Sequence, residues 1–261
     1  MISINRVYQK VLVIANKEQR GYITPQEFNL FADKAQMEIF TSYFHRIKNS
    51  TMKLSNQEPY ADEVEILEEK LHPLHVDRTY NVAADSILNL TIDPSDSTAT
   101  IEDVHKLISV TALSTARGSG NKLTQLNKHQ IAYTENNPLT KATLKRSIFV
   151  REDADKLTIF PSASTSTFNV DSDSNGTEDA ESFEVSYYKR PLPPNWTYNV
   201  VGGKALYNGS ASDLQNFELH PSEEEVLVSR ILMLAGVMMK QPDVQQAGVT
   251  DLQIINQSQN N

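Results

Sequence analysis

The chain has 261 residues, of which 39 % are hydrophobic and 22 % are charged, and its formal net charge is −9. This length supports one large domain or two small ones with an ordinary hydrophobic core. The negative balance disfavours a protein whose main task is to hold phosphate backbones. The sequence contains no cysteine, which excludes disulfides, thiolate nucleophiles and cysteine-ligated zinc.

The sequence carries no pattern of a signal peptide or a membrane span. Apolar residues in MISINRVYQKVLVIANKEQ are spaced rather than continuous, and no small-residue cleavage site follows them. The most apolar segment, Val226 to Met239, is shorter than the roughly 20 residues that span a bilayer. It also contains Arg230. We therefore expect a soluble, intracellularly made protein that has no membrane partner.

Two amphipathic helices are predicted at the start of the chain. Apolar residues between Ile4 and Ala15 recur every three or four positions and line one helical face. A second stripe runs from Phe28 to Ile47, in a helix expected to begin at Pro25. The two segments should form a helical hairpin whose second arm is long for a globular helix.

The stretch NKEQRGYITPQEF, between these two helices, matches a calcium loop at some positions. Arg20, however, occupies the fifth loop position, where an EF-hand needs an oxygen ligand and a fixed cation would repel the ion. A helix start explains more of the stretch, because Thr24 and Glu27 have the spacing of a capping box around Pro25. We therefore expect a capped helix rather than a calcium site.

The middle of the chain is predicted to be mostly β. A short acidic helix over Asp62 to Leu71 precedes this region. One further helix is expected within it, from Leu123 to Tyr133. Runs of β-branched and apolar residues bounded by turn signals predict the strands, which are SILNLTI, HKLISVTAL, SIFV, KLTIFP and SFEVSYY.

The last helix is predicted to begin at a second capping box, Ser222 to Glu225, and to stop at Pro242. Its apolar residues cover most of the circumference, so this helix should be buried against the N-terminal hairpin. The polar tail after Gln241 is either a frayed end or an arm that orders on a partner. The frayed end is the favoured interpretation.

Together these elements predict an α+β fold with three parts. The first part is the helical hairpin with the short acidic helix, over residues 1–72. The second is a mostly β region with one helix, over 73–219. The third is the buried last helix with its polar tail, over 220–261, and it should form one helical layer with the first part.

The stretch DSDSNG is the second candidate for a calcium site. Asp171, Asp173 and Asn175 provide oxygens at the first, third and fifth loop positions, and Gly176 follows. Ser182, however, stands where the bidentate glutamate should be. An acidic surface loop between strands is therefore the favoured interpretation, and a weak cation site is the alternative.

Two further motifs are weak. Pro73 keeps His72 and His75 off a regular helix face, and no further ligand pair is spaced to join them in a metal site. The stretch from Gly118 to Lys122 lacks the rest of a phosphate-loop motif and is more simply a turn. We therefore assign no catalytic, cofactor-binding or metal-binding residue, and expect no cofactor and no enzyme activity.

The aromatic stretch YYKRPLPPNWTY, from Tyr187 to Tyr198, has two interpretations. It contains the only tryptophan of the chain, with prolines that stiffen it. Such a segment could dock on a neighbouring molecule through its aromatic side chains. Equally, it could be a strand end followed by a loop that packs on its own domain. The sequence favours neither.

Three stretches of the chain look like structural proteins of tailed bacteriophages. They are ANKEQRGYITPQEFNLFADKAQMEIF near the start, SYYKRPLPPNW in the middle and FELHPSEEEVLVSRILMLAGVMMKQPDV near the end. Within that group, the order of helical hairpin, β insertion and late helix is similar to head-to-tail adaptor proteins. These proteins, also called connectors, form a ring beneath the portal. The resemblance covers most of the chain at the level of element order.

This resemblance implies a homo-oligomeric ring of about twelve subunits at the head-tail junction of the virion. The partners would be other copies of the chain, the portal protein and a downstream tail or nozzle protein. Genomic DNA would pass through the channel without specific binding, which suits a negative chain. The alternatives are another neck or tail ring component, a virion-associated hydrolase and a calcium-dependent binding module.

Overall fold

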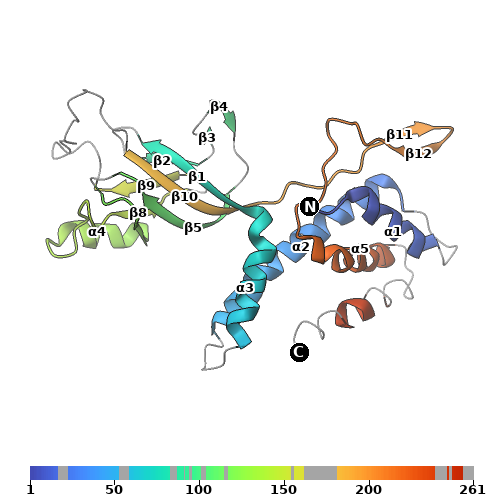
Figure 1. The fold of residues 1–261 in the computed structure, drawn as a ribbon, viewed down its shortest axis with the longest axis horizontal. Helices are drawn as coiled ribbons and strands as arrows, with labels where there is room; N and C mark the ends of the chain where they lie inside the picture. The colour runs from blue at the N-terminus through green and yellow to red at the C-terminus, as the bar shows by residue number, and fades with distance from the viewer. Residues whose placement is uncertain are drawn as a thin grey trace. The chain divides into compact units, whose positions relative to one another are not determined.

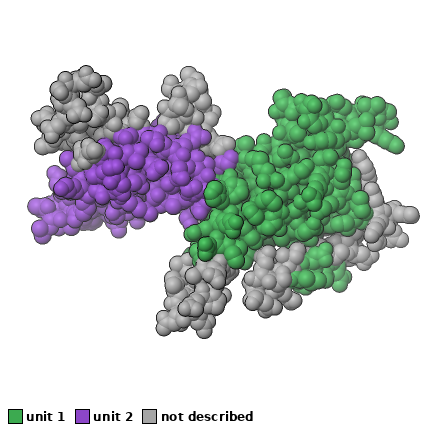
Figure 2. Space-filling model, viewed as in Figure 1, with its two compact units in different colours: residues 1–74, 191–261 green, residues 75–190 purple. Residues whose placement is uncertain are grey.

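The described chain is α+β, as the sequence predicts, and divides into two units. The computed structural model describes residues 1–16, 23–52, 59–82, 87–90, 92–93, 96–100, 104–114, 117–153, 156–161, 181–238, 246 and 249–254. We call Met1–Leu74 together with Pro191–Asn261 the helical unit (Figure 2). The inserted segment His75–Arg190 is the β unit.

Four helices and two short 3-10 turns make up the main body of the helical unit. They are α1 (Ile4–Asn16), α2 (Pro25–Met52), α3 (Pro59–Leu71), η1 (His72–Leu74), η2 (Pro221–Glu223) and α5 (Glu224–Met238) (Figure 1). Helix α5 packs against α1 and α2, and α3 packs against α2. The predicted apolar stripes form the core, with Val7, Val11, Phe28, Ala35, Ile39, Leu227, Ile231 and Ala235 all buried. The predicted burial of the last helix is thus confirmed.

The start of α2 has the predicted capping box. The Thr24 amide donates to Glu27 Oε2 at 2.9 Å, and the Glu27 amide donates back to Thr24 Oγ1 at 3.3 Å. These contacts satisfy two amides that the helix itself leaves without partners. The hydrogen bonds from the Thr24 side chain and backbone also hold the pKa of the Glu27 carboxyl below its usual value.

The start of α5 differs from the prediction. Pro221 places Ser222 inside the turn η2, so Ser222 does not cap the helix and the predicted box with Glu225 is wrong. His220 is the capping residue instead, and its Nδ1 accepts a hydrogen bond from the Ser222 amide at 3.3 Å. Glu225 forms an ion pair with Lys10 of α1. None of the helices that the structure describes is long and apolar enough to cross a membrane.

Two four-stranded sheets form the β unit. The first has the order β1 (His75–Val82), β10 (Glu181–Lys189), β5 (Val104–Ala112) and β6 (Asn121–Lys122). The second has the order β2 (Ile87–Asn89), β9 (Lys156–Phe160), β8 (Ile148–Arg151) and β7 (Thr124–Leu126). Side chains from both sheets share one apolar core, which includes Val110, Val185, Phe149 and Leu157. A separate strand pair joins β3 (Ile92–Asp93) to β4 (Asp96–Thr100).

The helix predicted from Leu123 to Tyr133 begins later than expected. Residues before Asn127 form β7, which pairs in parallel with β8, and α4 (Lys128–Asn136) connects the two strands. The Asn127 amide donates to Gln130 Oε1 at 3.1 Å, and this contact fixes the helix start. No described residue of α4 is buried. The connection is therefore a β-α-β crossover with an exposed helix.

The predicted C-terminal boundary of the β region, residue 219, differs from the boundary in the structure. The β unit ends at Arg190, and Pro191–Leu219 belongs to the helical unit. Ile2 and Phe217 exchange two backbone hydrogen bonds of 3.2 Å, which tie this segment to the N-terminus. The segment contains the strand pair β11 (Tyr198–Val201) and β12 (Lys204–Tyr207). The segment contains strands but belongs to the helical unit, and its local sequence pattern does not show to which unit it belongs.

Candidate assembly surface

Some of the residues considered for metal and phosphate binding lie in the described part of the chain. No group of three or more His, Asp or Glu residues is placed to hold a metal ion in the described part of the chain. His75 Nδ1 lies 3.5 Å from Asp77 Oδ2 on β1, while His72 belongs to η1. Gly118 and Gly120 have positive φ and shape a turn into β6, as expected. Arg20, Asp171, Asp173 and Asn175 lie outside the described residues.

One described histidine, His105 on β5, has a shifted pKa. Burial lowers the pKa of His105, and Arg190, Lys106 and Arg151 lower it further. These effects favour the neutral ring.

An open hollow lies on the surface of α2 and α5. It is lined by Asp33, Lys34, Met37, Glu38, Thr41, Ser42, His45 and Arg230. Glu38 is paired with Arg230 at 3.2 Å, and the Ser42 hydroxyl donates to the Ile39 carbonyl oxygen at 2.7 Å. The first contact joins α2 to α5, and the second lies within α2.

Trp196 anchors the proline-rich segment on its own helical unit. Its side chain is buried, and its ring centroid lies 4.3 Å from that of Tyr8 on α1. The indole Nε1 donates to Asn5 Oδ1 at 3.2 Å, and the Trp196 amide donates to Asn29 Oδ1 at 2.9 Å. Of the two interpretations of this stretch, the structure shows the loop that packs on its own domain.

Gln36 fixes the same segment at a second point. This side chain of α2 is fully buried. Its Nε2 donates to the Leu192 carbonyl oxygen at 2.8 Å, and its Oε1 accepts from the Glu218 amide at 3.2 Å. The Leu192 amide donates to Glu218 Oε2 at 3.0 Å. One buried amide side chain therefore holds both ends of the segment that carries β11 and β12.

The strand pair β11–β12 extends from this anchor as a two-stranded ribbon (Figure 1), and it carries exposed apolar side chains. The exposed fractions are 68 % for Val200, 60 % for Val201 and 53 % for Leu206. Val200 lies on the same ribbon face as Tyr198 and Tyr207, whereas Val201 and Leu206 lie on the opposite face. The ribbon therefore presents apolar side chains on both faces.

The base of the ribbon is rigid, and its tip is a tight turn. The Trp196 ring stacks on Tyr198 and Tyr207, with centroid distances of 5.7 Å and 5.8 Å. At the tip, Gly202 and Gly203 have φ values of 59° and 76°, the conformation that a two-residue hairpin turn requires. A two-stranded ribbon alone is marginally stable in water, and exposed apolar groups of this kind mark surfaces for protein contact.

Sequence reasoning missed the ribbon and the polar residues that anchor it. The ribbon had a local signal, because NVVGGKALY places Gly-Gly between two short strand-like runs. Asn29 and Gln36 had a weaker signal, since each is a polar residue beside the predicted apolar stripe of α2. No protein-family model matches the chain, and no curated protein matches it either.

Proposed function

We propose that this chain is a structural protein of a tailed bacteriophage and forms a homo-oligomeric adaptor ring at the head-to-tail junction. In this role it binds the portal protein, extends the DNA channel and offers a platform for the tail. The proposal joins the resemblance of the sequence to one observation in the structure. That observation is the β11–β12 ribbon, which exposes apolar side chains on both faces from an anchored base.

The ribbon suits a building block better than an enzyme. A closed ring needs each subunit to offer one surface that fits a different surface of its neighbour. A projecting strand pair can meet a neighbour through its apolar side chains and also has backbone groups at its two outer edges for strand addition. The anchoring contacts of Trp196 and Gln36 lower the ordering cost of such an interaction, because the base of the ribbon is already fixed.

The end of the chain is the second element that we assign to assembly. Residues 249–254 are helical, and the exposed fraction of Ile254 is 59 %. We propose that the region from Gln241 onward is an arm that docks on the portal. Deletion of residues 241–261 should leave a folded protein that no longer enters virus particles. Normal incorporation of the shortened protein would exclude this role for the arm.

The decisive experiment for the ring compares the wild-type protein with a ribbon variant. Native mass spectrometry of the purified chain should show one closed oligomer of about twelve copies. The variant Val200→Glu/Leu206→Glu places a charge on each face of the ribbon and should stay monomeric, with a circular dichroism spectrum like that of the wild type. A matched control is Leu30→Glu, which alters an exposed apolar side chain of α2 that lies outside the ribbon.

The place in the virion is tested by counting copies. Quantitative mass spectrometry of purified virus particles should give a copy number near that of a portal ring, relative to the major capsid protein. Copies in the hundreds would assign the chain to a tail tube or a capsid decoration. Complete absence from particles would favour the hydrolase and the calcium-dependent binding module.

A further inference from the structure

Positive charge is concentrated in one segment of this acidic chain. Residues 117–151 contain seven Lys or Arg residues and one carboxylate, Glu135, which gives this segment a net charge of +6. Since the whole chain carries −9, the remaining residues together carry −15. The segment comprises β6, β7, α4 and β8 of the β unit. Arg117 is buried, so the other six cations supply the positive surface of this segment, which can attract a negatively charged partner.

The exposed members of this segment include lysines and two large apolar side chains. We define the basic patch as Lys122, Lys128, Tyr133, Leu139, Lys141 and Lys145, all of which are exposed. Tyr133 and Leu139 have exposed fractions of 82 % and 87 %, the highest among the described large hydrophobic residues. No ion pair is recorded for these four lysines within the described part of the chain.

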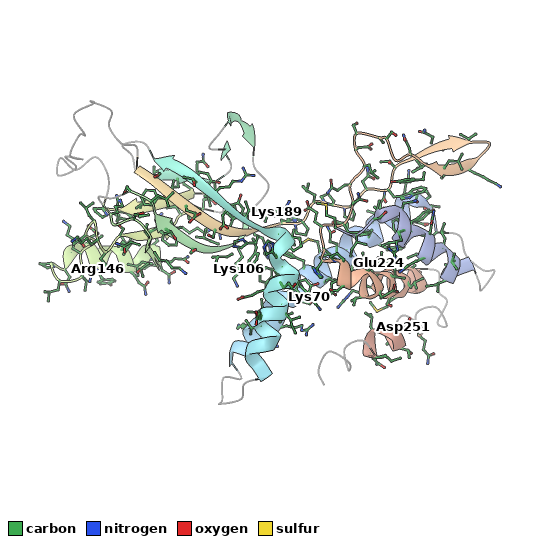
Figure 3. All side chains as sticks on the ribbon, in the orientation of Figure 1. Lys70, Lys106, Arg146, Lys189, Glu224 and Asp251 are labelled. Atoms are coloured by element: carbon green, nitrogen blue, oxygen red, sulfur yellow. The ribbon has the colours of Figure 1, made fainter. Side chains whose placement is uncertain are left out.

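The loop that carries much of the basic patch is held in a defined conformation. Arg146, beside α4 in Figure 3, donates through one nitrogen to the carbonyl oxygens of Leu139 at 3.3 Å and Lys141 at 3.1 Å. Glu135 of α4 accepts from the Ala142 amide at 3.3 Å. The only carboxylate of the segment is therefore used within the loop, and the patch is presented on ordered backbone.

Helix α3 of the helical unit has a surface of the opposite charge. Leu67 and Leu71 bury one side of the helix, while Glu65, Glu68 and Glu69 are exposed on the rest. Ile66 lies among them with an exposed fraction of 53 %. Like charges three and four residues apart destabilise a helix, so a cationic partner would relieve the repulsion between Glu65 and its two neighbours. We call these four exposed residues the acidic face.

We propose that the basic patch of one copy docks on the acidic face of α3 in a neighbouring copy. This inference rests on the proposed ring and names one contact within it. The two surfaces match in two respects: lysines oppose glutamates, and apolar side chains lie within both charged sets. Since the surfaces differ and each chain has both, the contact is heterologous, as a closed ring requires.

A second copy fits the basic patch better than nucleic acid does. Double-stranded DNA offers a dense row of phosphates, which selects for many cations and gives no binding site for Tyr133 and Leu139. The acidic face offers three carboxylates and Ile66 in about one and a half helical turns, so it can meet both the lysines and the apolar side chains of the patch. Charges at the rim of an apolar contact also fix its register.

Exchange of the charges tests the contact. Variant A is Lys128→Glu/Lys141→Glu/Lys145→Glu, and variant B is Glu65→Lys/Glu68→Lys/Glu69→Lys. Each alone would bring like charges together, so each should need at least a tenfold higher concentration to form the ring in native mass spectrometry. An equimolar mixture of A and B should assemble as readily as the wild type, because opposite charges then meet at every contact.

The control and the alternative outcomes separate this inference from the proposed function. Lys34→Glu/Lys156→Glu changes exposed lysines elsewhere and should assemble normally. If the wild-type chain never forms a ring, the proposed function is overturned. If A alone and B alone form rings as well as the wild type does, only this contact is overturned. The contact would lie within one chain if the mixture of A and B formed no rings while a single chain with all six changes did form them. Normal rings with loss of duplex DNA binding by A would assign the patch to nucleic acid. Both of these results overturn the inference.

Discussion

The two units depend on buried polar side chains to different degrees. In the helical unit, such side chains join segments that are far apart in the sequence, as Gln36 joins α2 to Leu192 and Glu218. In the β unit, strand pairing fixes the register, and the largest buried polar side chain is Arg117. Arg117 lies 5.4 Å from the Phe183 ring centroid and donates to Ser147 Oγ and the Pro161 carbonyl oxygen, both at 2.8 Å.

This difference indicates which substitutions should destabilise each unit most. A sheet shares its backbone hydrogen bonds among many residues, so the loss of one side chain leaves the ladder in place. The position of residues 191–219 in the helical unit depends instead on a few side chains with exact partners. Substitution of those side chains should therefore cost more than most changes in the β unit, apart from changes at its apolar core and at Arg117.

The largest effect is expected at the ion pair between Lys70 of α3 and Glu223 of η2. Lys70 is labelled on α3 in Figure 3. Its Nζ lies 2.7 Å from Glu223 Oε1, and the two side chains are 12 % and 4 % exposed. Glu223→Ala leaves Lys70 buried without this partner and should lower the free energy of unfolding by about 3–5 kcal/mol. Urea unfolding measures this change.

Two control variants show whether burial causes this effect. Lys70→Met/Glu223→Leu removes both charges and should recover most of the lost stability. Arg6→Ala breaks the ion pair between Arg6 and Glu224, in which the Arg6 side chain is 67 % exposed. This change should lower the free energy of unfolding by about 1 kcal/mol or less. Equal losses in Glu223→Ala and Arg6→Ala would contradict the prediction.

The next effect is expected at Gln36. Gln36→Leu keeps the size of the side chain but removes the partners of the Leu192 carbonyl and the Glu218 amide. We expect a loss of about 3 kcal/mol, because two backbone groups are left without hydrogen bonds. Faster amide hydrogen exchange over residues 191–219 should accompany it. Gln125→Leu, on the exposed strand β7 of the β unit, is the matched control and should change the stability little.

A smaller effect is expected at the glycine turn of the β unit. Gly118 and Gly120 have φ values of 84° and 86°, so alanine is strained at both positions, by about 1 kcal/mol. A Cβ atom at Gly118 would also lie 2.5 Å from Asn121 Nδ2, whereas none of the surrounding atoms lies within 4 Å at Gly120. Gly118→Ala should therefore cost about 1 kcal/mol more than Gly120→Ala in urea unfolding, because Asn121 must give up its bond to the Arg117 carbonyl. Equal costs would show that the Asn121 side chain adapts freely.

The contrast between the units also explains what the sequence could predict. The box of Thr24 and Glu27 and the strands β5, β8, β9 and β10 depend on contacts or patterns within a few residues, and these were predicted. Trp196 and Asn29 are 167 positions apart, so nothing local in the sequence relates them. The predicted boundary at 219 failed for the same reason, since the strand character of β11 and β12 does not show which core holds them.

Local patterns can also compete with each other. Ser222 and Glu225 have the spacing of a capping box, but Pro221 and His220 impose a 3-10 turn first. Leu123 and Leu126 fit a helical stripe, yet Leu123 is buried in the β core and Leu126 pairs with Val150 of β8. In the first case the two preceding residues decide between the two local structures. In the second case the pairing with β8 and burial in the β core decide.

The smallest effect is expected at the cap of α2 and has a defined pH dependence. The pKa of Glu27 is lowered in the folded chain by its hydrogen bonds with Thr24. The ionised carboxylate therefore stabilises the fold above its unfolded-state pKa, and this contribution is lost as the pH falls through the folded-state pKa. Glu27→Gln keeps a hydrogen-bonding side chain but removes the charge. Because the site is exposed to solvent, we expect a loss below about 0.5 kcal/mol at pH 7.

Thermal unfolding of the wild type and of Glu27→Gln across a pH series measures this term. The Tm difference between the two proteins should be present at pH 7 and should vanish once the pH has fallen below the lowered pKa of Glu27, where both side chains are neutral. Acid effects from other carboxylates act on both proteins and cancel in the difference. A Tm difference that stays constant below that pKa would show that the shape of the side chain, and not its charge, stabilises the helix start.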